Sequence, residues 1–399
     1  MNWKKSFTLI AGGQAVSLLG SHGVQFALIW YLAERTNSAL MLGLAGIVAY
    51  VPQVIFGPLA GIVADRYDQR FVSVAADVSM GIVAASYALL LAHRDLPAWS
   101  VLLVLAARGI GDTFQEPAIQ SLLPTLVPKT ALGQINGWLQ LLRGGAFLFG
   151  PPIGAMLYAT LALPWVLLSD IVGAVFASTA LLCVRLPAGA GANPAARFGW
   201  RSWWVGVQAI KAHRALAVMI AADAVTMSLY APLASLYPLM TSGYFKLSAL
   251  YGSAVEFSFA IGMLVSALLF ATVVTMHAHL RWSRRGIAMM GLAACLCGLL
   301  PPTLAGWGGF AVACALLAAA GNLHSIPLTT AIQQTIPADQ LGRALSVQTM
   351  GNGLMMPVGL AFASPVADKI GVPNWFVVAG LGMVGCFILA SVWLRRLGH

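Results

Sequence analysis

Apolar runs alternate with short polar or charged breaks along the whole chain. A helix needs about 20 mostly apolar residues to cross the hydrocarbon core of a bilayer. Runs near or above that length occur at residues 7–32, 40–63, 71–92, 97–121, 134–159, 163–184, 215–240, 249–276, 286–304, 308–333, 344–367 and 374–394. The pattern therefore predicts an all-α integral membrane protein with twelve transmembrane helices.

The longest polar interval divides these runs into six and six. It extends from Arg185 to Arg214 and is rich in proline and glycine. A short repeat supports the division, because residues 127–134 (VPKTALGQ) resemble residues 336–343 (IPADQLGR) between the corresponding runs of the second half. We therefore predict two pseudo-symmetric six-helix bundles, at residues 1–184 and 215–399, joined by a cytoplasmic linker at residues 185–214.

Composition excludes an ordinary soluble domain, since 59% of the residues are hydrophobic and only 9% are charged. The net charge of +10 does not indicate nucleic-acid binding, because the basic residues are spread over many loops. Most of them fall in the alternate loops that share a side with the N-terminus. The opposite loops carry only Arg35, Arg94, Lys246 and Lys369. This imbalance predicts that the chain spans the cytoplasmic (inner) membrane with both termini in the cytoplasm.

The sequence offers no motif for a cofactor, a metal ion or an enzymatic reaction. Its five cysteines show neither metal-ligand nor disulfide spacing. Neither His-Glu-x-x-His nor Gly-x-Ser-x-Gly occurs, so we do not expect an enzyme. A Gly-x-x-x-x-Gly-Lys-Ser/Thr loop for ATP is also missing, which leaves an ion gradient as the expected source of energy.

Charged residues cluster between the second and third runs. The stretch Gly61-Ile62-Val63-Ala64-Asp65-Arg66-Tyr67-Asp68-Gln69-Arg70 has the pattern Gly-x-x-x-Asp-Arg-x-x-x-Arg. It resembles the signature loop of major facilitator superfamily transporters, which implies that Gly61, Asp65, Arg66 and Arg70 form contacts that hold one access state closed. Asp65 is then expected at the positive N-terminal end of the eleventh run, near residues 342–343. The alternative is a static ion network at the membrane surface.

A second motif lies in the fifth run. Gly150-Pro151-Pro152-Ile153-Gly154 resembles the Gly-Pro-x-x-Gly element of the superfamily's antiporters, although Ala155 stands where a second glycine is usual. Proline kinks a helix and glycine permits close approach of a neighbouring helix. The resemblance implies that Gly150, Pro151 and Gly154 belong to an exporter rather than an importer.

Six acidic residues fall within apolar runs, where a charge is costly unless it faces protein or water. They are Asp77, Asp112, Glu116, Asp170, Asp223 and Glu256. Arg108, Asp112 and Glu116 share one helix face, so Arg108 can neutralise Asp112 and leave Glu116 less compensated. The segment Arg108-Gly109 also resembles an Arg-Gly motif that the superfamily uses in proton transfer. For Arg108, Asp112 and Glu116, proton coupling and structural pairing both remain open.

Glu256 lies well inside the eighth run with no basic residue nearby in sequence. The segment around it resembles macrolide-efflux-type members of the superfamily, which carry an acid at this place. The likeness extends to Tyr230-Ala231-Pro232 and to Asp368-Lys369-Ile370-Gly371-Val372. It implies that Glu256 couples transport to protons, whereas the alternative is an acid bonded permanently to a neighbouring helix.

Polar and aromatic residues lie along one face of several runs. Asp223, Met227, Tyr230 and Tyr237 share a face of the seventh run. This face predicts either a cavity for lipophilic cations, with Asp223 as a further proton-coupling acid, or ordinary packing. The same two interpretations apply to the polar residues Gln14, Gln25 and Asn322. We expect His22 and His324 to be hydrogen-bonded packing residues, since no acid is adjacent in sequence.

These features predict a secondary active exporter of lipophilic drugs, macrolide-like or multidrug, that uses proton antiport with alternating access. Its partners would be a lipophilic small molecule, protons and the lipid bilayer, and we expect a monomer without a cofactor. The alternative is an exporter or flippase of an endogenous amphiphile, such as a siderophore or a lysophospholipid.

Overall fold

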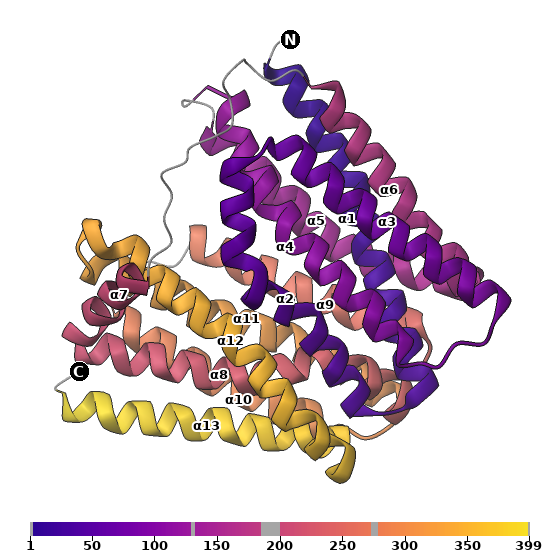
Figure 1. Cartoon of the computed structure of the whole chain (residues 1–399). Coiled ribbons are helices and arrows are strands. Elements are labelled where there is room, and N and C mark those ends of the chain that lie inside the picture. Colours follow the sequence, from indigo (N-terminus) through magenta and orange to yellow (C-terminus); the bar gives the residue numbers. More distant parts are fainter. Residues whose placement is uncertain (1–2, 129–131, 185–199, 273–277, 398–399) are drawn as a thin grey trace. The chain divides into compact units, whose positions relative to one another are not determined.

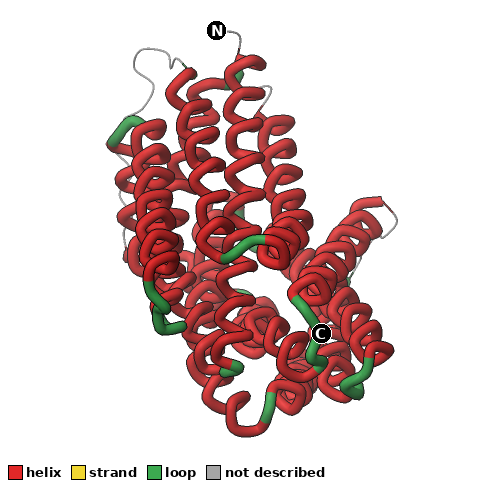
Figure 2. Tube along the Cα trace, turned by 90° about the vertical axis from the view of Figure 1, so that its right-hand side faces the viewer, coloured by secondary structure: helices red, strands yellow, loops and turns green. Residues whose placement is uncertain are grey.

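A computed structural model describes residues 3–128, 132–184, 200–272 and 278–397. Within these ranges the regular secondary structure is entirely helical (Figure 2). Some side chains inside the ranges lie outside the description. They include those of the predicted loop residues Gly61, Asp65 and Arg66 and of residues 342 and 343, so the contact expected between them stays a prediction.

Each of the twelve apolar runs corresponds to a helix (Figure 1). The helices are α1 (Trp3–Thr36), α2 (Ala39–Arg66), α3 (Gln69–His93), α4 (Ser100–Leu126), α5 (Leu132–Thr160), α6 (Leu163–Cys183), α7 (Trp200–Ala212), α8 (Arg214–Leu239), α9 (Ala249–Thr272), α10 (His279–Leu299), α11 (Leu304–Thr335), α12 (Ala338–Ile370) and α13 (Val372–Arg396). A five-residue π-helical turn, η2 (Met240–Tyr244), extends α8. Backbone groups in lipid must be satisfied internally, which explains why long apolar runs fold as helices.

In the described part of the chain, eight helical segments are long and apolar enough by themselves to cross a membrane. The predicted span α4 is not among them, and it carries three charged side chains, Arg108, Asp112 and Glu116. Charged helices of this kind cross a bilayer only where protein or water surrounds their charges. The position of α4 in the fold therefore depends on its partners.

The predicted boundaries of the ninth run are wrong. The ninth run was expected at residues 286–304, but α10 begins at His279 and ends at Leu299. Pro301 and Pro302 follow, and the Thr303 side chain then caps α11 by accepting a hydrogen bond from the Gly306 amide at 3.0 Å. Within the predicted linker at 185–214, residues Trp200–Ala212 form helix α7, which the apolar runs did not indicate.

The chain forms two compact units. The N-terminal unit comprises residues 1–36 and 48–197, and the C-terminal unit comprises residues 37–47 and 198–399. In the N-terminal unit α1 packs against α5 and α6, while α3 packs against α4 and α6. In the C-terminal unit α10 packs against α11 and α13, α8 against α12 and α13, and α9 against α11. The first turns of α2 thus belong to the C-terminal unit, which the predicted division at 184 and 215 did not anticipate.

Glycines allow α1 and α5 to approach closely in the N-terminal unit. A Cβ atom at Gly23 would lie 3.2 Å from the Gly150 carbonyl oxygen and 3.3 Å from the Gly154 nitrogen. A Cβ atom at Gly154 would collide with the backbone of Gly23. The two glycines of the predicted antiporter motif therefore have a packing function in α5, whatever else they do.

We expect Gly154→Val to destabilise the protein by about 1–3 kcal/mol, because the new side chain must push α1 away from α5. The measurement is the thermal unfolding midpoint of the detergent-solubilised protein. Gly145→Val on the same helix is the matched control, since a Cβ atom there meets nothing within 4 Å. Equal midpoints for the two variants would contradict the proposed packing role.

Candidate functional site

Arg108 on α4 forms a buried ion pair with Asp170 on α6. The Arg108 guanidinium also donates a hydrogen bond to the Ser21 carbonyl oxygen of α1 at 3.1 Å, and the Ser21 hydroxyl group donates to Asp170 Oδ1 at 2.9 Å. This arrangement corrects the expectation that Asp112 is the neutralising partner. Asp112 lies on the same face of α4 within electrostatic range, but the direct partner comes from another helix.

Glu116 is compensated as well, which the sequence did not predict. Its Oε1 atom lies 3.0 Å from Arg143 Nη1 on α5, and the two side chains are 57% and 35% exposed. A third acid of this unit, Asp77 on α3, is buried and accepts a hydrogen bond from Gln115 on α4, while its Oδ2 atom has no hydrogen-bond partner. The acids of the N-terminal unit therefore range from fully paired to partly unsatisfied.

Glu256 on α9 is only weakly satisfied. Its Oε2 atom is buried and has no hydrogen-bond partner, while the Tyr237 hydroxyl group on α8 interacts with the carboxyl group. In the described residues no basic side chain forms an ion pair with Glu256. A carboxyl group without a counter-charge at this depth is more stable when it carries a proton.

Asp223 on α8 is the centre of a buried polar network. Its Oδ1 atom lies 2.9 Å from His324 Nε2 on α11, and its Oδ2 atom accepts hydrogen bonds from Gln348 and Asn352 on α12. On its other side, the His324 ring contacts Ser283 on α10. The sequence suggested packing for His324 because no acid is adjacent along the chain. The structure supplies that acid from a different helix.

The residues predicted to line a cavity differ in their burial and in their contacts. The Asn322 amide donates to the Met263 carbonyl oxygen at 2.7 Å and to Ser266 Oγ at 3.0 Å, so it links α11 to α9. Tyr230 is half-buried, and its ring centroid lies 6.5 Å from that of Phe259. The cavity role of three further residues stays a prediction. Met227 and Gln25 are half-buried, and Gln14 is buried with an Nε2 atom that has no hydrogen-bond partner.

The loop before α3 is held by Asp68 and Arg70. Asp68 caps α3 by accepting a hydrogen bond from the Arg70 amide at 3.0 Å, and its carboxylate lies 2.7 Å from Arg70 Nη2. The hydrogen bond from the Arg70 side chain lowers the pKa of the Asp68 carboxyl group from its ordinary value. Arg70 Nη1 also donates to the Val184 carbonyl oxygen at the end of α6 at 2.8 Å, so Arg70 bridges two helix ends within this unit.

Sequence reasoning missed a cap at the start of α2. In the C-terminal unit, the Asp368 carboxylate on α12 accepts hydrogen bonds from the Ser38 hydroxyl group at 2.9 Å and from the amides of Ala39 and Leu40 at 2.5 and 3.0 Å. An acid at a helix N-terminus is favourable for both the free amides and the helix dipole. The sequence indicates only a family likeness for Asp368–Val372, because the groups that Asp368 caps lie more than 300 residues away.

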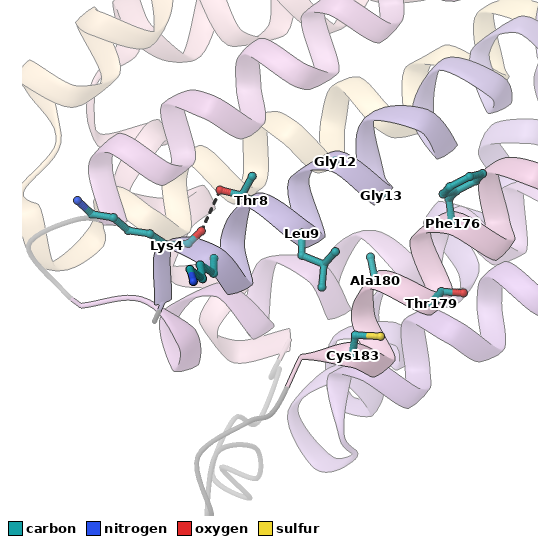
Figure 3. A pocket seen from close by; sticks show the side chains of 10 residues that line it. Lys4, Thr8, Leu9, Gly12, Gly13, Phe176, Thr179, Ala180 and Cys183 are labelled. Atoms are coloured by element: carbon teal, nitrogen blue, oxygen red, sulfur yellow. Dashed lines mark hydrogen bonds between the residues drawn. The ribbon is translucent and has the colours of Figure 1, made fainter. Parts of the chain in front are cut away.

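A groove of about 650 Å³ lies between the start of α1 and the end of α6 (Figure 3). Lys4, Lys5, Leu9, Gly12, Phe176 and Cys183 are among the residues that line it. None of the acids described above contributes to its wall. The groove is therefore separate from the candidate coupling residues.

Comparisons with known proteins identify relatives along nearly the whole chain. Residues 10–360 match the family described as the Major Facilitator Superfamily. Macrolide efflux protein A of Streptococcus pyogenes is 32% identical over 380 residues, which cover 95% of this chain and 93% of that protein. The staphyloferrin A transporter of Staphylococcus aureus (strain NCTC 8325 / PS 47) is 22% identical over 389 residues, covering 95% and 93%.

Solved structures agree with this assignment at the level of the fold. A POT family transporter in complex with a thioalcohol-conjugated peptide aligns with a TM-score of 0.74 at 13% identity, covering 99% of this chain and 97% of that chain. At such low identity the similarity concerns the fold alone.

Proposed function

Because this chain belongs to the Major Facilitator Superfamily, whose members are multi-pass membrane transporters, we propose that it exports lipophilic drugs, macrolide-like or multidrug, by proton antiport with alternating access. The membership confirms the all-α fold predicted from the apolar runs and the major facilitator fold implied by the motif resemblance. It also confirms that the chain is a transporter rather than an enzyme. Location in the inner membrane with cytoplasmic termini, and a monomeric state, are parts of the proposal. The location and the orientation of the termini are supported by the distribution of Lys and Arg over the loops.

The observation that carries the proposal is the 32% identity to macrolide efflux protein A over 95% of this chain. Identity at that level extends over both bundles, so it includes the helices that carry the intramembrane acids. A shared substrate class is the simplest reason for such similarity along two whole chains.

In the proposed cycle Glu256 is the principal proton carrier. Its buried Oε2 atom lacks a hydrogen-bond partner, which favours the protonated carboxyl group, while release of the proton creates a negative charge beside Tyr237. A lipophilic cation on the Met227, Tyr230 and Tyr237 face of α8 would compensate that charge. Proton and drug would then bind alternately, as antiport requires.

The remaining predicted residues have supporting functions in this proposal. Arg108, Asp112 and Glu116 would transmit or hold a proton in the N-terminal unit. Gly61, Asp65, Arg66 and Arg70 would stabilise one access state from the cytoplasmic loop. The close contact of α1 and α5 at Gly150 and Gly154, next to Pro151, would limit how far these helices separate.

The test uses inverted membrane vesicles that contain the protein and maintain an acidic interior by respiration. Addition of a macrolide is expected to raise the interior pH, because each drug molecule entering the vesicle exchanges for protons leaving it. A pH-sensitive fluorescent dye measures the change, and vesicles without the protein are the control. If macrolides and other lipophilic cations change the interior pH no more than in vesicles without the protein, drug–proton antiport is refuted.

The similarity to the staphyloferrin A transporter favours a second candidate, export of a siderophore. The same vesicles distinguish the two candidates. If the interior pH responds to a siderophore but not to lipophilic drugs, the substrate is a siderophore and the proton antiport mechanism still holds.

A further inference from the structure

Three helices of the C-terminal unit bring a histidine, an acid and a serine together. His324 on α11 is 0% exposed, Asp223 on α8 is 2% exposed and Ser283 on α10 is 0% exposed. His324 Nε2 lies 2.9 Å from Asp223 Oδ1, and His324 Nδ1 lies 2.8 Å from Ser283 Oγ and 3.1 Å from the Ser283 carbonyl oxygen. Both ring nitrogens therefore have defined partners in a closed environment.

The partners of Asp223 fit an ionised carboxylate. Gln348 Nε2 and Asn352 Nδ2, which only donate, lie 3.0 and 2.9 Å from Asp223 Oδ2. Together with His324 Nε2 they present three N–H donors to one carboxylate. A proton on Asp223 would displace one of these donors, so the negative charge stays on Asp223.

The partners of His324 fit both protonation states of the ring. In neutral imidazole Nε2–H donates to Asp223, and the Ser283 hydroxyl group donates to Nδ1. In imidazolium, Nδ1–H donates to the Ser283 carbonyl oxygen or to Oγ, and the Ser283 hydroxyl hydrogen rotates away. Neither state leaves a buried donor or acceptor on the ring unsatisfied, so these surroundings permit a change of protonation state.

No second charge in the described residues interacts with this pair. The side chains that face it from α12 are the amides Gln348 and Asn352, and α10 contributes Ser283. On α13 the nearby titratable group is Cys386, whose Sγ atom lies 3.5 Å from the Ala222 carbonyl oxygen, and α9 meets α11 through Ser266 and Asn322. The local net charge is therefore −1 with neutral His324 and zero with protonated His324.

We propose that His324 is a second proton-binding site of this transporter, where a proton binds to Nδ1 and forms an ion pair with an Asp223 that stays ionised. The inference rests on the proposed proton antiport and adds a site to it. In the binding step a hydronium ion gives one proton to Nδ1, so an O–H bond breaks and the N–H bond forms, and the Ser283 hydroxyl group changes from donor to acceptor. No other bond breaks, and release of the proton reverses the step.

The proposal gives Ser283 a testable effect on pH dependence. Ser283→Ala removes the donor that satisfies neutral His324, but it retains the carbonyl oxygen that accepts from protonated His324. The neutral form is thus weakened selectively. The pH dependence of drug-coupled proton release should therefore move to higher pH by about 0.5–1 unit in Ser283→Ala, since one hydrogen bond is lost from one form only.

The experiment measures protons released when a macrolide binds to the purified protein in weak buffer, as a function of pH. His324→Gln should release fewer protons than wild type, because glutamine can still donate to Asp223 but cannot take up a proton. Ser283→Ala should keep the wild-type proton number with its midpoint moved to higher pH. His22→Gln, at the half-buried membrane histidine of the N-terminal unit, is the matched control and should match wild type.

The outcomes separate the two proposals. Absence of any drug-dependent proton release from wild type would refute antiport itself. A wild-type number and midpoint in His324→Gln, or an unshifted midpoint in Ser283→Ala, would refute the second site while antiport stands. If His324→Gln does not fold, as judged by its thermal unfolding, the midpoint of the milder Ser283→Ala variant decides the question.

Discussion

Replacement of Glu256 by glutamine is expected to reduce drug export by about tenfold or more. Binding of one ligand typically changes the affinity for a coupled ligand about 5–150-fold, and this effect on the drug is lost when the proton can no longer bind and leave. Glutamine has nearly the shape of glutamic acid and keeps a polar contact for Tyr237, but it cannot release a proton. The variant therefore resembles a carrier that is permanently protonated. Drug-dependent proton movement in vesicles and drug resistance of cells measure the loss.

The control for this result is Asp95→Asn. Asp95 forms an exposed ion pair with Arg35 at 2.6 Å, in a loop region where loss of one charge has little effect. It should export drug like wild type. If Glu256→Gln exported drug as fast as Asp95→Asn at every pH, Glu256 would not be the principal proton carrier. Glu256→Asp, which preserves the acid, should retain part of the activity.

Replacement of Arg108 by glutamine is expected to lower the free energy of unfolding by about 3–5 kcal/mol, because it leaves the buried Asp170 carboxylate without its partner. The double variant Arg108→Gln with Asp170→Asn removes both charges and should recover most of the loss. Thermal unfolding of the purified protein and its yield in membranes measure the effect.

Arg143→Gln is the matched control, since it breaks an ion pair of the same bundle that is partly exposed. Its effect should be about 1 kcal/mol or less. Equal destabilisation by Arg108→Gln and Arg143→Gln would show that the buried pair contributes no more than the exposed one. A stable double variant that fails to exchange drug for protons would assign Arg108 a role in transport. Normal exchange would leave it a structural residue.

The helices were predictable because lipid imposes one solution on a long apolar run. The twelve runs became helices, and the charged breaks became helix ends. Errors arose where a local cap outweighed hydropathy, as at Thr303 after Pro301 and Pro302, and where a helix lay in a polar interval, as with α7 at Trp200–Ala212. The resemblance to the superfamily could be recognised for a related reason, since its motifs are short local patterns.

The partners of the intramembrane charges were not predictable in the same way. Helical periodicity places Arg108, Asp112 and Glu116 on one face, but it does not say which neighbouring helix meets that face. Asp170 and Arg143 lie on other helices, and both change the interpretation of their partners. Whether a buried charge has an ion-pair or hydrogen-bond partner depends on the distances between helices. The sequence of one helix does not specify these distances.

The amino-acid sequence by itself determined that the long apolar runs are helical, which acids lie within those runs and which family pattern the chain follows, because these properties are local. The tertiary structure alone decided that Arg108 pairs with Asp170, that Glu256 retains an unsatisfied oxygen atom, and that Asp223 meets His324 from 101 residues away. The physical reason is that a buried ionisable group acquires its chemistry from the side chains packed around it, and packing joins residues that are distant along the chain.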